Sequence, residues 1–556
     1  MKKIIYTTTI FATLLTGCNF LDDNPQGIMT EKEAISKADE LVTTAYSSLG
    51  NDHYDAPFSL WIYGNVRADD AYKGGQDVSD IQHFHFYEIA QNIDPTFGEA
   101  DRFWFMCYMA ISRTNTALKA LQQASDAEVA NRQSRMGEMY FLRGHFYFVL
   151  KTIFGHIPFV DENTPDSAYE TTPNTLPNDE QWQKIVADFK KAYDLLPNTQ
   201  PQKGRADKYA AAAYLAKAYL YKAYRQSENN SVTGINSQDL QEVLTYTSFA
   251  LGSSYGLEDD FAFNFLPGGY ENGKESMFAV QYSVDDGTQY GRLNWGDQLS
   301  APQKLGCCDF HKPSQNLVNA FKTVNGLPDF DNFNNNDYNA ANDKADPRLF
   351  HTVALPGLPY KYNAELIYKN DWNRNSNVYG FYASLKENVD PSCSCFRNIN
   401  PFRGNSKNRI LIRYADVLLM RAEALIELNR SNEALSLINQ VRQRAKQSTS
   451  MIPYATNTDI AVYQNGVNCT WNQEFARKAL RWERRLEFAM EGSRFFDLVR
   501  WGIADQVLND YFTKEKTRRP AIFSSAYFTK NKNEYIPIPQ NQIGYVKGIY
   551  KQNAGF

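Results

Sequence analysis

The sequence lacks three features that would each have indicated a class of function. It has no excess of basic residues, since 58 Lys and Arg stand against 63 Asp and Glu, and nucleic-acid binding requires a basic surface. It has no zinc-ligand spacing, because neither a Cys-x-x-Cys motif nor a suitably placed His accompanies its seven cysteines. After the N-terminal leader it has no apolar run of the roughly 20 residues that a membrane-spanning helix needs. We therefore predict no metal, no cofactor and no nucleic-acid partner.

What is present begins with a short leader. Lys2 and Lys3 precede an apolar stretch over residues 4–16, and the chain then reads Gly17-Cys18. This pattern is typical of a signal peptide, and a small residue before Cys at the cleavage point resembles the lipobox of bacterial lipoproteins. The resemblance implies that residues 1–17 are removed and that Cys18 carries acyl chains, which bury methylene groups in a membrane. A leader that merely ends near an ordinary cysteine is the alternative.

The length of the chain, 556 residues, exceeds what one compact core accommodates, so several lobes or an extended helical array are expected. Apolar residues recur with helical spacing in several stretches. Two pairs of these stretches carry Ala where a neighbouring helix would approach. Such pairs resemble tetratricopeptide repeats, although no period of about 34 residues is found. The predicted helices span residues 31–49, 99–122, 128–154, 179–196, 207–224, 237–251, 411–428 and 433–445.

Two regions differ in composition from these helices. Residues 51–97 form a polar, aromatic loop region, and residues 255–407 are rich in Gly, Asn, Asp, Pro and aromatic side chains. We predict a mainly α protein in which residues 255–407 form a loop-rich lobe on a helical scaffold. Loops held by a rigid scaffold commonly carry recognition, so a ligand is expected on this lobe.

Three segments of the C-terminal third point to one family: Arg413–Ala424, Glu483–Gly502 and Tyr535–Pro539. Together they resemble the SusD/RagB family of surface glycan-binding lipoproteins, and the resemblance covers essentially the whole mature chain. It implies a helical N-terminal region with tetratricopeptide-type helices over residues 18–254. The ligand-binding lobe would then span residues 255–407, and a second helical region would span residues 408–556.

The resemblance also implies a function. Members capture oligosaccharides outside the cell without cutting them and act as a hinged lid over a TonB-dependent outer-membrane transporter of the SusC type. A lipid on Cys18 would hold this chain on the outer membrane, and Asp22 and Asp23 resemble the tag that sends such lipoproteins to the cell exterior. Members of the RagB type handle peptides, so peptide import is the alternative within the family.

The segment Glu483–Gly502 is rich in charges spaced three residues apart. The pairs are Arg484 with Glu487, Glu491 with Arg494, and Asp497 with Arg500. This spacing permits ion pairs on a helix, and a helix surface with alternating charges is the ordinary state of such carboxylates. We therefore interpret this segment as scaffold, in preference to a catalytic acidic cluster.

Several candidate ligand-binding residues follow from the resemblance. Trp104 stands at the start of a helix where related proteins often place part of a sugar platform, and the pair Asp69 and Asp70 lies nearby in such proteins. A flat aromatic face suits the C–H side of a sugar, and carboxylates bond its hydroxyl groups. A core tryptophan is the alternative for Trp104.

The adjacent cysteines Cys307 and Cys308 are the most unusual local feature. Neighbouring Cα atoms lie about 3.8 Å apart, which is below the usual range for a disulfide, so a bond between them forms a strained ring that closes almost no loop. Such a ring would offer a hard apolar surface to a sugar. The pair also resembles a feature of fructan-binding members, which favours levan or inulin as ligand. Two independent thiols are the alternative.

The same lobe supplies further candidates: Trp295, Trp372, Arg374 and Tyr379. An aromatic ring in a polar loop is less often buried than one in a helix, and Arg bonds two hydroxyls at once. The Asp- and Asn-rich run 329–337 does not match a calcium loop.

Two other functions fit the sequence less well. A glycoside hydrolase needs two carboxylates held apart across a sugar, and no convincing pair is present. A helical scaffold for protein partners alone would not explain the aromatic-rich loops.

Overall fold

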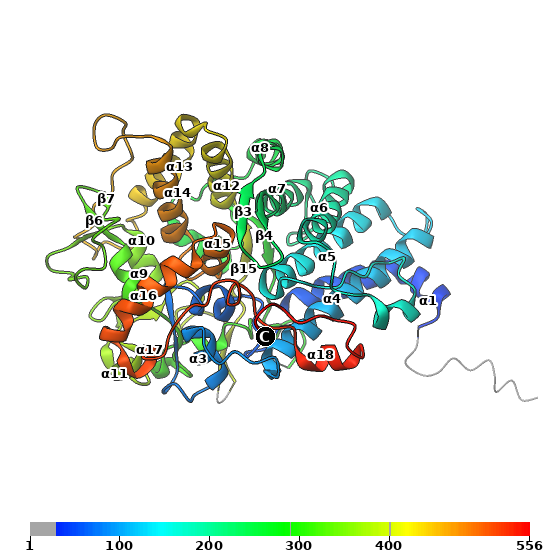
Figure 1. Cartoon of the computed structure of the whole chain (residues 1–556), viewed down its shortest axis with the longest axis horizontal. Helices are drawn as coiled ribbons and strands as arrows, with labels where there is room; N and C mark the ends of the chain where they lie inside the picture. The colour runs from blue at the N-terminus through cyan, green and yellow to red at the C-terminus, as the bar shows by residue number, and fades with distance from the viewer. Residues whose placement is uncertain (1–28, 290, 400–401) are drawn as a thin grey trace, which may run out of the picture.

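The computed structural model describes residues 29–289, 291–399 and 402–556. The predicted leader, Cys18, Asp22 and Asp23 lie outside the described residues. A row of helices packed in chain order forms one side of the protein (Figure 1), and each helix contacts the next in the row. The row consists of α4 (Gly98–Gln123), α5 (Arg132–Phe154), α6 (Asn178–Leu195), α7 (Lys208–Ala223), α8 (Ser237–Leu251), α12 (Tyr414–Glu427), α13 (Ser431–Gln447) and α14 (Gln473–Glu487).

The protein is therefore mainly α-helical, as predicted, and the predicted helix pairs are present. The first pair is α7 with α8, and the second is α12 with α13. The Ala-rich face of α7 is fully buried, from Ala210 to Ala213 and again at Ala216 and Ala218. Small side chains at these positions allow the neighbouring helices to approach closely. Among the described residues, no helix combines the length and the apolar character needed to cross a membrane.

Side-chain caps fix where several of these helices begin. Asp207 accepts a hydrogen bond from the Ala210 amide at 2.8 Å at the start of α7. Asn236 accepts one from the Asp239 amide at 2.9 Å at the start of α8. Each cap satisfies a backbone donor that has no partner within the helix.

The remaining helices are short or lie at the ends of the chain. They are α1 (Glu31–Ser36), α2 (Ala38–Ser47), α3 (Gln82–Ile89), α9 (Gln315–Ala320), α10 (Arg348–Thr352), α11 (Ser376–Tyr379), α15 (Arg494–Arg500), α16 (Ala504–Arg518), α17 (Pro520–Phe523) and α18 (Gln540–Tyr545). The predicted loop region 51–97 is more ordered than expected. It contains a π-helical turn over Trp61–Val66, the strand β1 (Ala71–Gly74) and helix α3.

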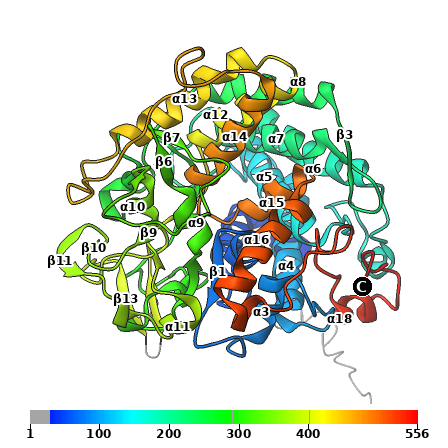
Figure 2. The ribbon, with the colours of Figure 1, turned by 60° about the vertical axis from the view of Figure 1, so that its left-hand side comes forward.

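The loop-rich lobe is built from short strands that pair in twos and threes. Figure 2 shows the lobe, in green and yellow, beside the helical row. Antiparallel pairing of β15 (Arg409–Arg413) with β4 (Ser276–Val280) joins lobe and scaffold, with Arg409 opposite Val280 and Arg413 opposite Ser276. The other strands are β2 (Tyr224–Gln226), β3 (Val232–Ile235), β5 (Phe310–Pro313), β6 (Lys322–Val324), β7 (Leu327–Pro328), β8 (Lys344–Ala345), β9 (Val353–Ala354), β10 (Pro359–Tyr360), β11 (Asn363–Ile367), β12 (Ala383–Ser384), β13 (Phe396–Ile399) and β14 (Phe402–Asn405).

A buried network of ion pairs connects the lobe to the scaffold. Glu487, at the end of α14, accepts from Arg348 of the lobe at 2.9 Å and from Arg413 and Arg444 of the scaffold. All four side chains are almost completely inaccessible to solvent. Burial disfavours the charged carboxylate, but Arg444, Arg413 and Arg348 hold the pKa of Glu487 well below its usual value.

This network corrects the predicted ion pairs of the segment Glu483–Gly502. Of the three pairs expected at a spacing of three, the structure contains Asp497 with Arg500, at 2.9 Å. Arg484 instead binds Asp416 and Asp497, from different parts of the chain. The segment is scaffold, as interpreted, but its charges lie in the interior, because distant guanidinium groups satisfy the carboxylates there. The expectation that these charges alternate on a helix surface was therefore wrong.

Candidate functional site

Trp104 lies in the core and not on a surface. Its indole is 2% exposed and packs edge-on against Phe154, with ring centroids 5.0 Å apart. Tyr108 and Tyr550 contact the same indole. A ligand cannot reach a face that these rings cover, so the expectation of a sugar platform at Trp104 is corrected to a core role.

Asp69 and Asp70 are also interior. Arg485 binds both carboxylates, at 2.9 and 2.8 Å, and Arg494 binds Asp69 at 2.8 Å. Burial opposes the charge on Asp69, but Arg485 and Arg494 lower the pKa of Asp69 to about 2. Both carboxylates join the β1 region to the C-terminal segment. Their expected contact with a ligand is therefore corrected to a structural role, because their charge is already neutralised inside the protein.

Two of the four further lobe candidates, Trp372 and Tyr379, are also interior. Trp372 and Tyr379 are buried, and Trp372 packs beside Tyr368, with centroids 5.3 Å apart, in a small second core. Arg374 is exposed and pairs with Asp80 at 2.7 Å, so its contact with a ligand remains a prediction. The Asn-rich loop thus folds its tryptophan inward, and the predicted contacts of Trp372 and Tyr379 are corrected to packing.

Cys307 and Trp295 lie nearer the surface, and both are partly exposed. Cys307 is joined as a disulfide to Cys308, which is buried. Gly306 lies directly beneath Arg403, since a Cβ on this glycine would stand 2.1 Å from Arg403 Cγ. The disulfide and the Arg403 guanidinium therefore belong to one small area of the lobe.

Two aromatic side chains that sequence reasoning did not select, Tyr54 and Phe402, form a stacked pair, and Phe402 immediately precedes Arg403 in β14. Tyr54 stacks on Phe402, with centroids 6.0 Å apart and ring planes 26° apart, and the His53 ring lies 4.2 Å from that of Tyr54. Both aromatic rings are partly exposed. We call His53, Tyr54, Trp295, Phe402 and Arg403 the aromatic platform.

The loop that carries Tyr54 is held against Trp295 by the neighbouring backbone. Asp52 accepts from the Phe58 amide at 2.9 Å, and a Cβ on Gly296 would stand 2.1 Å from Asp52 Oδ2. Trp61 Nε1 donates to the Gly296 carbonyl at 3.1 Å. These contacts place the 51–57 loop against the segment of Trp295, although the two are far apart in sequence.

Polar groups surround the platform. Asp55 accepts from His53 Nδ1 at 2.6 Å and lies 3.5 Å from Arg102 Nε, whose side chain is 48% exposed. Arg403 donates one bond to the Phe402 carbonyl at 3.1 Å. Guanidinium groups carry five donors each, so Arg102 and Arg403 retain donors that can bond hydroxyl groups directionally.

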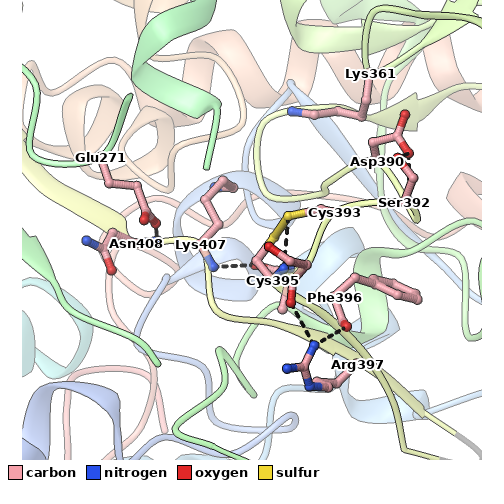
Figure 3. The surroundings of a disulfide bond; sticks show 12 residues. Glu271, Lys361, Asp390, Ser392, Cys393, Cys395, Phe396, Arg397, Lys407 and Asn408 are labelled. Atoms are coloured by element: carbon pink, nitrogen blue, oxygen red, sulfur yellow. Dashed lines mark hydrogen bonds between the residues drawn. A yellow bond between two sulfur atoms is a disulfide. The ribbon is translucent and has the colours of Figure 1, made fainter. Parts of the chain in front are cut away.

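A second disulfide supports the hairpin that presents Phe402. Cys393 and Cys395 are joined just before β13, and the Ser406 amide after β14 donates to the Cys395 carbonyl at 3.0 Å. Figure 3 shows the turn that these cysteines form, with Phe396 and Arg397 extending from it. β13 and β14 pair from Phe396 with Asn405 to Ile399 with Phe402. The hairpin is thus anchored at its base.

Family models match both parts of the chain. A model described as "SusD family" matches residues 274–556, and one described as "Starch-binding associating with outer membrane" matches residues 19–220. A SusD-like protein P2 from Formosa agariphila is 24% identical over the full length of both chains.

Solved structures share the fold. A SusD homolog from Bacteroides thetaiotaomicron is 20% identical, with a TM-score of 0.71 and coverage of 95% of this chain and 99% of that one. A surface glycan-binding protein A from Bacteroides fluxus is 22% identical, with a TM-score of 0.68 and coverage of 94% and 99%.

Proposed function

Because this chain belongs to the SusD family, we propose that it is a non-catalytic glycan-binding lipoprotein that captures oligosaccharides and delivers them to a SusC-like TonB-dependent transporter. The observation that carries the proposal is the aromatic platform, in which Tyr54 stacks on Phe402 and the exposed Arg102 lies 3.5 Å from the neighbouring Asp55. The name of the relative from Bacteroides fluxus, a surface glycan-binding protein, supports the same ligand class.

The platform has the chemistry that a sugar requires. The partly exposed rings of Tyr54, Trp295 and Phe402 provide flat apolar surface for the C–H face of a pyranose or furanose ring. Arg102 and Arg403 provide donors for its hydroxyl groups. Recognition in such a site comes from a few placed polar groups around an apolar surface.

We propose fructan, such as levan or inulin, as the ligand. The Cys307–Cys308 disulfide borders the platform beneath Arg403 and presents Cys307 at the surface. A vicinal disulfide resembles a feature of fructan-binding members of the family. It adds a compact, polarisable surface that a small furanose ring can contact.

Location follows from the predicted anchor. Acyl chains on Cys18 would hold the protein on the outer membrane, and Asp22 and Asp23 favour the outer face. We predict that Cys18→Ala removes the protein from the membrane fraction of cells, because a lipid anchor is what retains it there. Unchanged membrane association of this variant, measured by immunoblotting of separated fractions, would contradict the anchor.

The proposal is tested by affinity electrophoresis of the purified protein against levan, inulin, starch, xylan and mannan, with calorimetry against peptides. Retardation by levan or inulin is the expected result. Binding only to peptides would favour the RagB-type alternative. The recovered fructan should show no new reducing ends, and their appearance would instead indicate a glycoside hydrolase.

A further inference from the structure

A tight turn carries one ring of the aromatic platform together with a carboxylate. The Ala56 amide donates to the His53 carbonyl at 3.0 Å, so residues 53–56 form a closed turn with Tyr54 and Asp55 at its two central positions. Ala56 is completely buried, which anchors this turn on the core. The backbone therefore fixes where the carboxylate stands relative to the Tyr54 ring.

Two side chains from different elements converge on this carboxylate. His53 Nδ1 donates to Asp55 Oδ1 at 2.6 Å, and Arg102 Nε, from the first turns of α4, lies 3.5 Å from the same oxygen. The side chains of His53 and Arg102 are 40% and 48% exposed, whereas that of Asp55 is 18% exposed. Asp55 thus orients two side chains whose far ends reach solvent.

Each of these three side chains keeps a polar atom without a protein partner. Within the part of the chain that the structure describes, no hydrogen bond reaches Asp55 Oδ2, His53 Nε2 or the Nη groups of Arg102. The nearby Glu99 carboxylate is buried and already pairs with His83, at 3.0 Å. Asp55 therefore offers a free acceptor next to free donors, beside the exposed Tyr54 ring.

A carboxylate and a guanidinium side by side suit two neighbouring hydroxyl groups. A carboxylate only accepts hydrogen bonds and a guanidinium only donates them, whereas a hydroxyl does both. One hydroxyl of a pair can therefore donate to Asp55 while its neighbour accepts from Arg102. The hydroxyls of a sugar ring project from its rim, so a ring stacked on Tyr54 presents them towards this group.

We propose that Asp55 is a specificity-determining residue of the platform, which reads two adjacent free hydroxyls of the bound sugar together with Arg102 and His53. This inference rests on the proposed capture of a glycan. In levan and in inulin, each internal furanose ring keeps two neighbouring hydroxyls free of linkages. The group therefore recognises rings along a fructan chain and not only the ring at its end.

The test compares a levan oligosaccharide, or whichever glycan the protein retains, with the same molecule after methylation of its hydroxyls. A methyl ether oxygen still accepts from Arg102 but has no hydrogen to donate to Asp55. By calorimetry, the intact protein should bind the methylated form about tenfold more weakly, as the loss of one hydrogen bond to a charged group predicts. Equal affinities for the two forms would overturn the proposal.

A variant pair assigns this discrimination to Asp55. Asp55→Ala should bind the native oligosaccharide about tenfold more weakly and leave the affinity for the methylated form nearly unchanged. Asp510→Ala, at an exposed position on α16, should behave like the unaltered protein. If Asp55→Ala weakened binding of both forms alike, the carboxylate would only shape the turn, and the assignment would be refuted.

The two levels of the proposal fail in different ways. Glycan binding without discrimination between the native and methylated forms would keep the proposed function and remove the role of Asp55. An intact protein that binds no glycan of either form would remove both.

Discussion

At the scale of single residues, Tyr54 and Trp104 show what decides the role of an aromatic side chain. Tyr54 lies on a loop and contacts two rings, those of His53 and Phe402, which leave part of its surface open. Trp104 lies on a helix whose neighbours cover the indole. The same residue class is therefore open to a ligand at one position and stabilises the core at the other.

Tyr54→Ala should weaken binding of a levan oligosaccharide by about 3- to 10-fold, which corresponds to about 0.5–1.5 kcal/mol for one aromatic contact. Isothermal titration calorimetry measures the change. Tyr545→Ala is the matched control, because that tyrosine is 66% exposed on α18. The platform would be refuted if the two variants bound levan equally well.

Trp104→Ala should instead destabilise the fold, by about 3–5 kcal/mol, because it leaves a large cavity in the core. Urea denaturation followed by circular dichroism gives the free energy of unfolding. If this variant lost levan affinity at full stability, the core assignment of Trp104 would fail.

Glu487→Gln should lower the free energy of unfolding by about 3–5 kcal/mol, because three buried guanidinium groups lose their shared carboxylate. Glu433→Gln serves as control, since Glu433 pairs with Arg430 in solvent and should leave stability unchanged. Equal stability of the two variants would show that the buried network contributes little.

At the scale of elements, the fold depends on one close approach of two backbones. The π-helical turn Trp61–Val66 packs on the loop between α14 and α15, and a Cβ on Gly64 would stand 1.9 Å from the Gly492 carbonyl oxygen. Gly492 itself has a φ of +80°. Glycine is required at both positions, at one for space and at the other for conformation.

Gly64→Ala should therefore force the turn and the loop apart and lower the thermal midpoint by several degrees, as overpacking by about 1–3 kcal/mol predicts. Gly98→Ala makes the same chemical change at the first residue of α4, where a Cβ meets nothing within 4 Å. Its midpoint should remain unchanged or rise. A midpoint for Gly64→Ala equal to that of the unaltered protein would contradict the close approach.

The helices were the part of the fold most open to prediction from sequence. Their apolar spacing is local, so α4, α5 and α6 begin and end close to the predicted bounds. The burial of Trp104 was not predictable in this way, because Tyr550 and Phe154 come from elsewhere in the chain. The stacking of Tyr54 on Phe402 depends on the same kind of long-range contact.

The cysteine pair was the one strong local signal for the candidate site. Adjacent cysteines are visible in the sequence, whereas the packing of Arg403 on Gly306, the residue before the pair, depends on a long-range contact. For Asp69 and Asp70 the sequence supplied the charge but not the partner, since Arg485 and Arg494 lie in a distant segment. The predicted boundaries at residues 254 and 407 remain predictions.

At the scale of the whole molecule, buried carboxylates should make the fold sensitive to acid. Burial opposes the charge on Glu423, but Arg500 lowers the pKa of this carboxyl from 4.5 to about 2. The pKa of Asp69 is likewise lowered to about 2 by its arginine partners. A carboxyl whose pKa is lower in the folded state than in the unfolded state stabilises the fold at pH values above its unfolded-state pKa. This contribution is lost as the pH falls towards 2. Burial raises the pKa of Asp207 to about 6. This carboxyl therefore acts in the opposite sense, because its protonation between pH 6 and pH 4 favours the folded state.

The free energy of unfolding should therefore fall steeply between pH 4 and pH 2, as urea titrations at several pH values would measure. Glu423→Gln should reduce this slope, because an amide does not titrate in that range. A slope that is identical in the two proteins would show that Glu423 is not among the groups responsible.

The most direct test of the central claim is hydrogen–deuterium exchange with and without a saturating levan oligosaccharide, or another glycan that the protein retains. The account predicts slower exchange in residues 51–57, 293–308, 396–399 and 402–405, which carry the aromatic platform and its disulfide. Protection confined to α4 around Trp104, or no protection with any bound glycan, would contradict it.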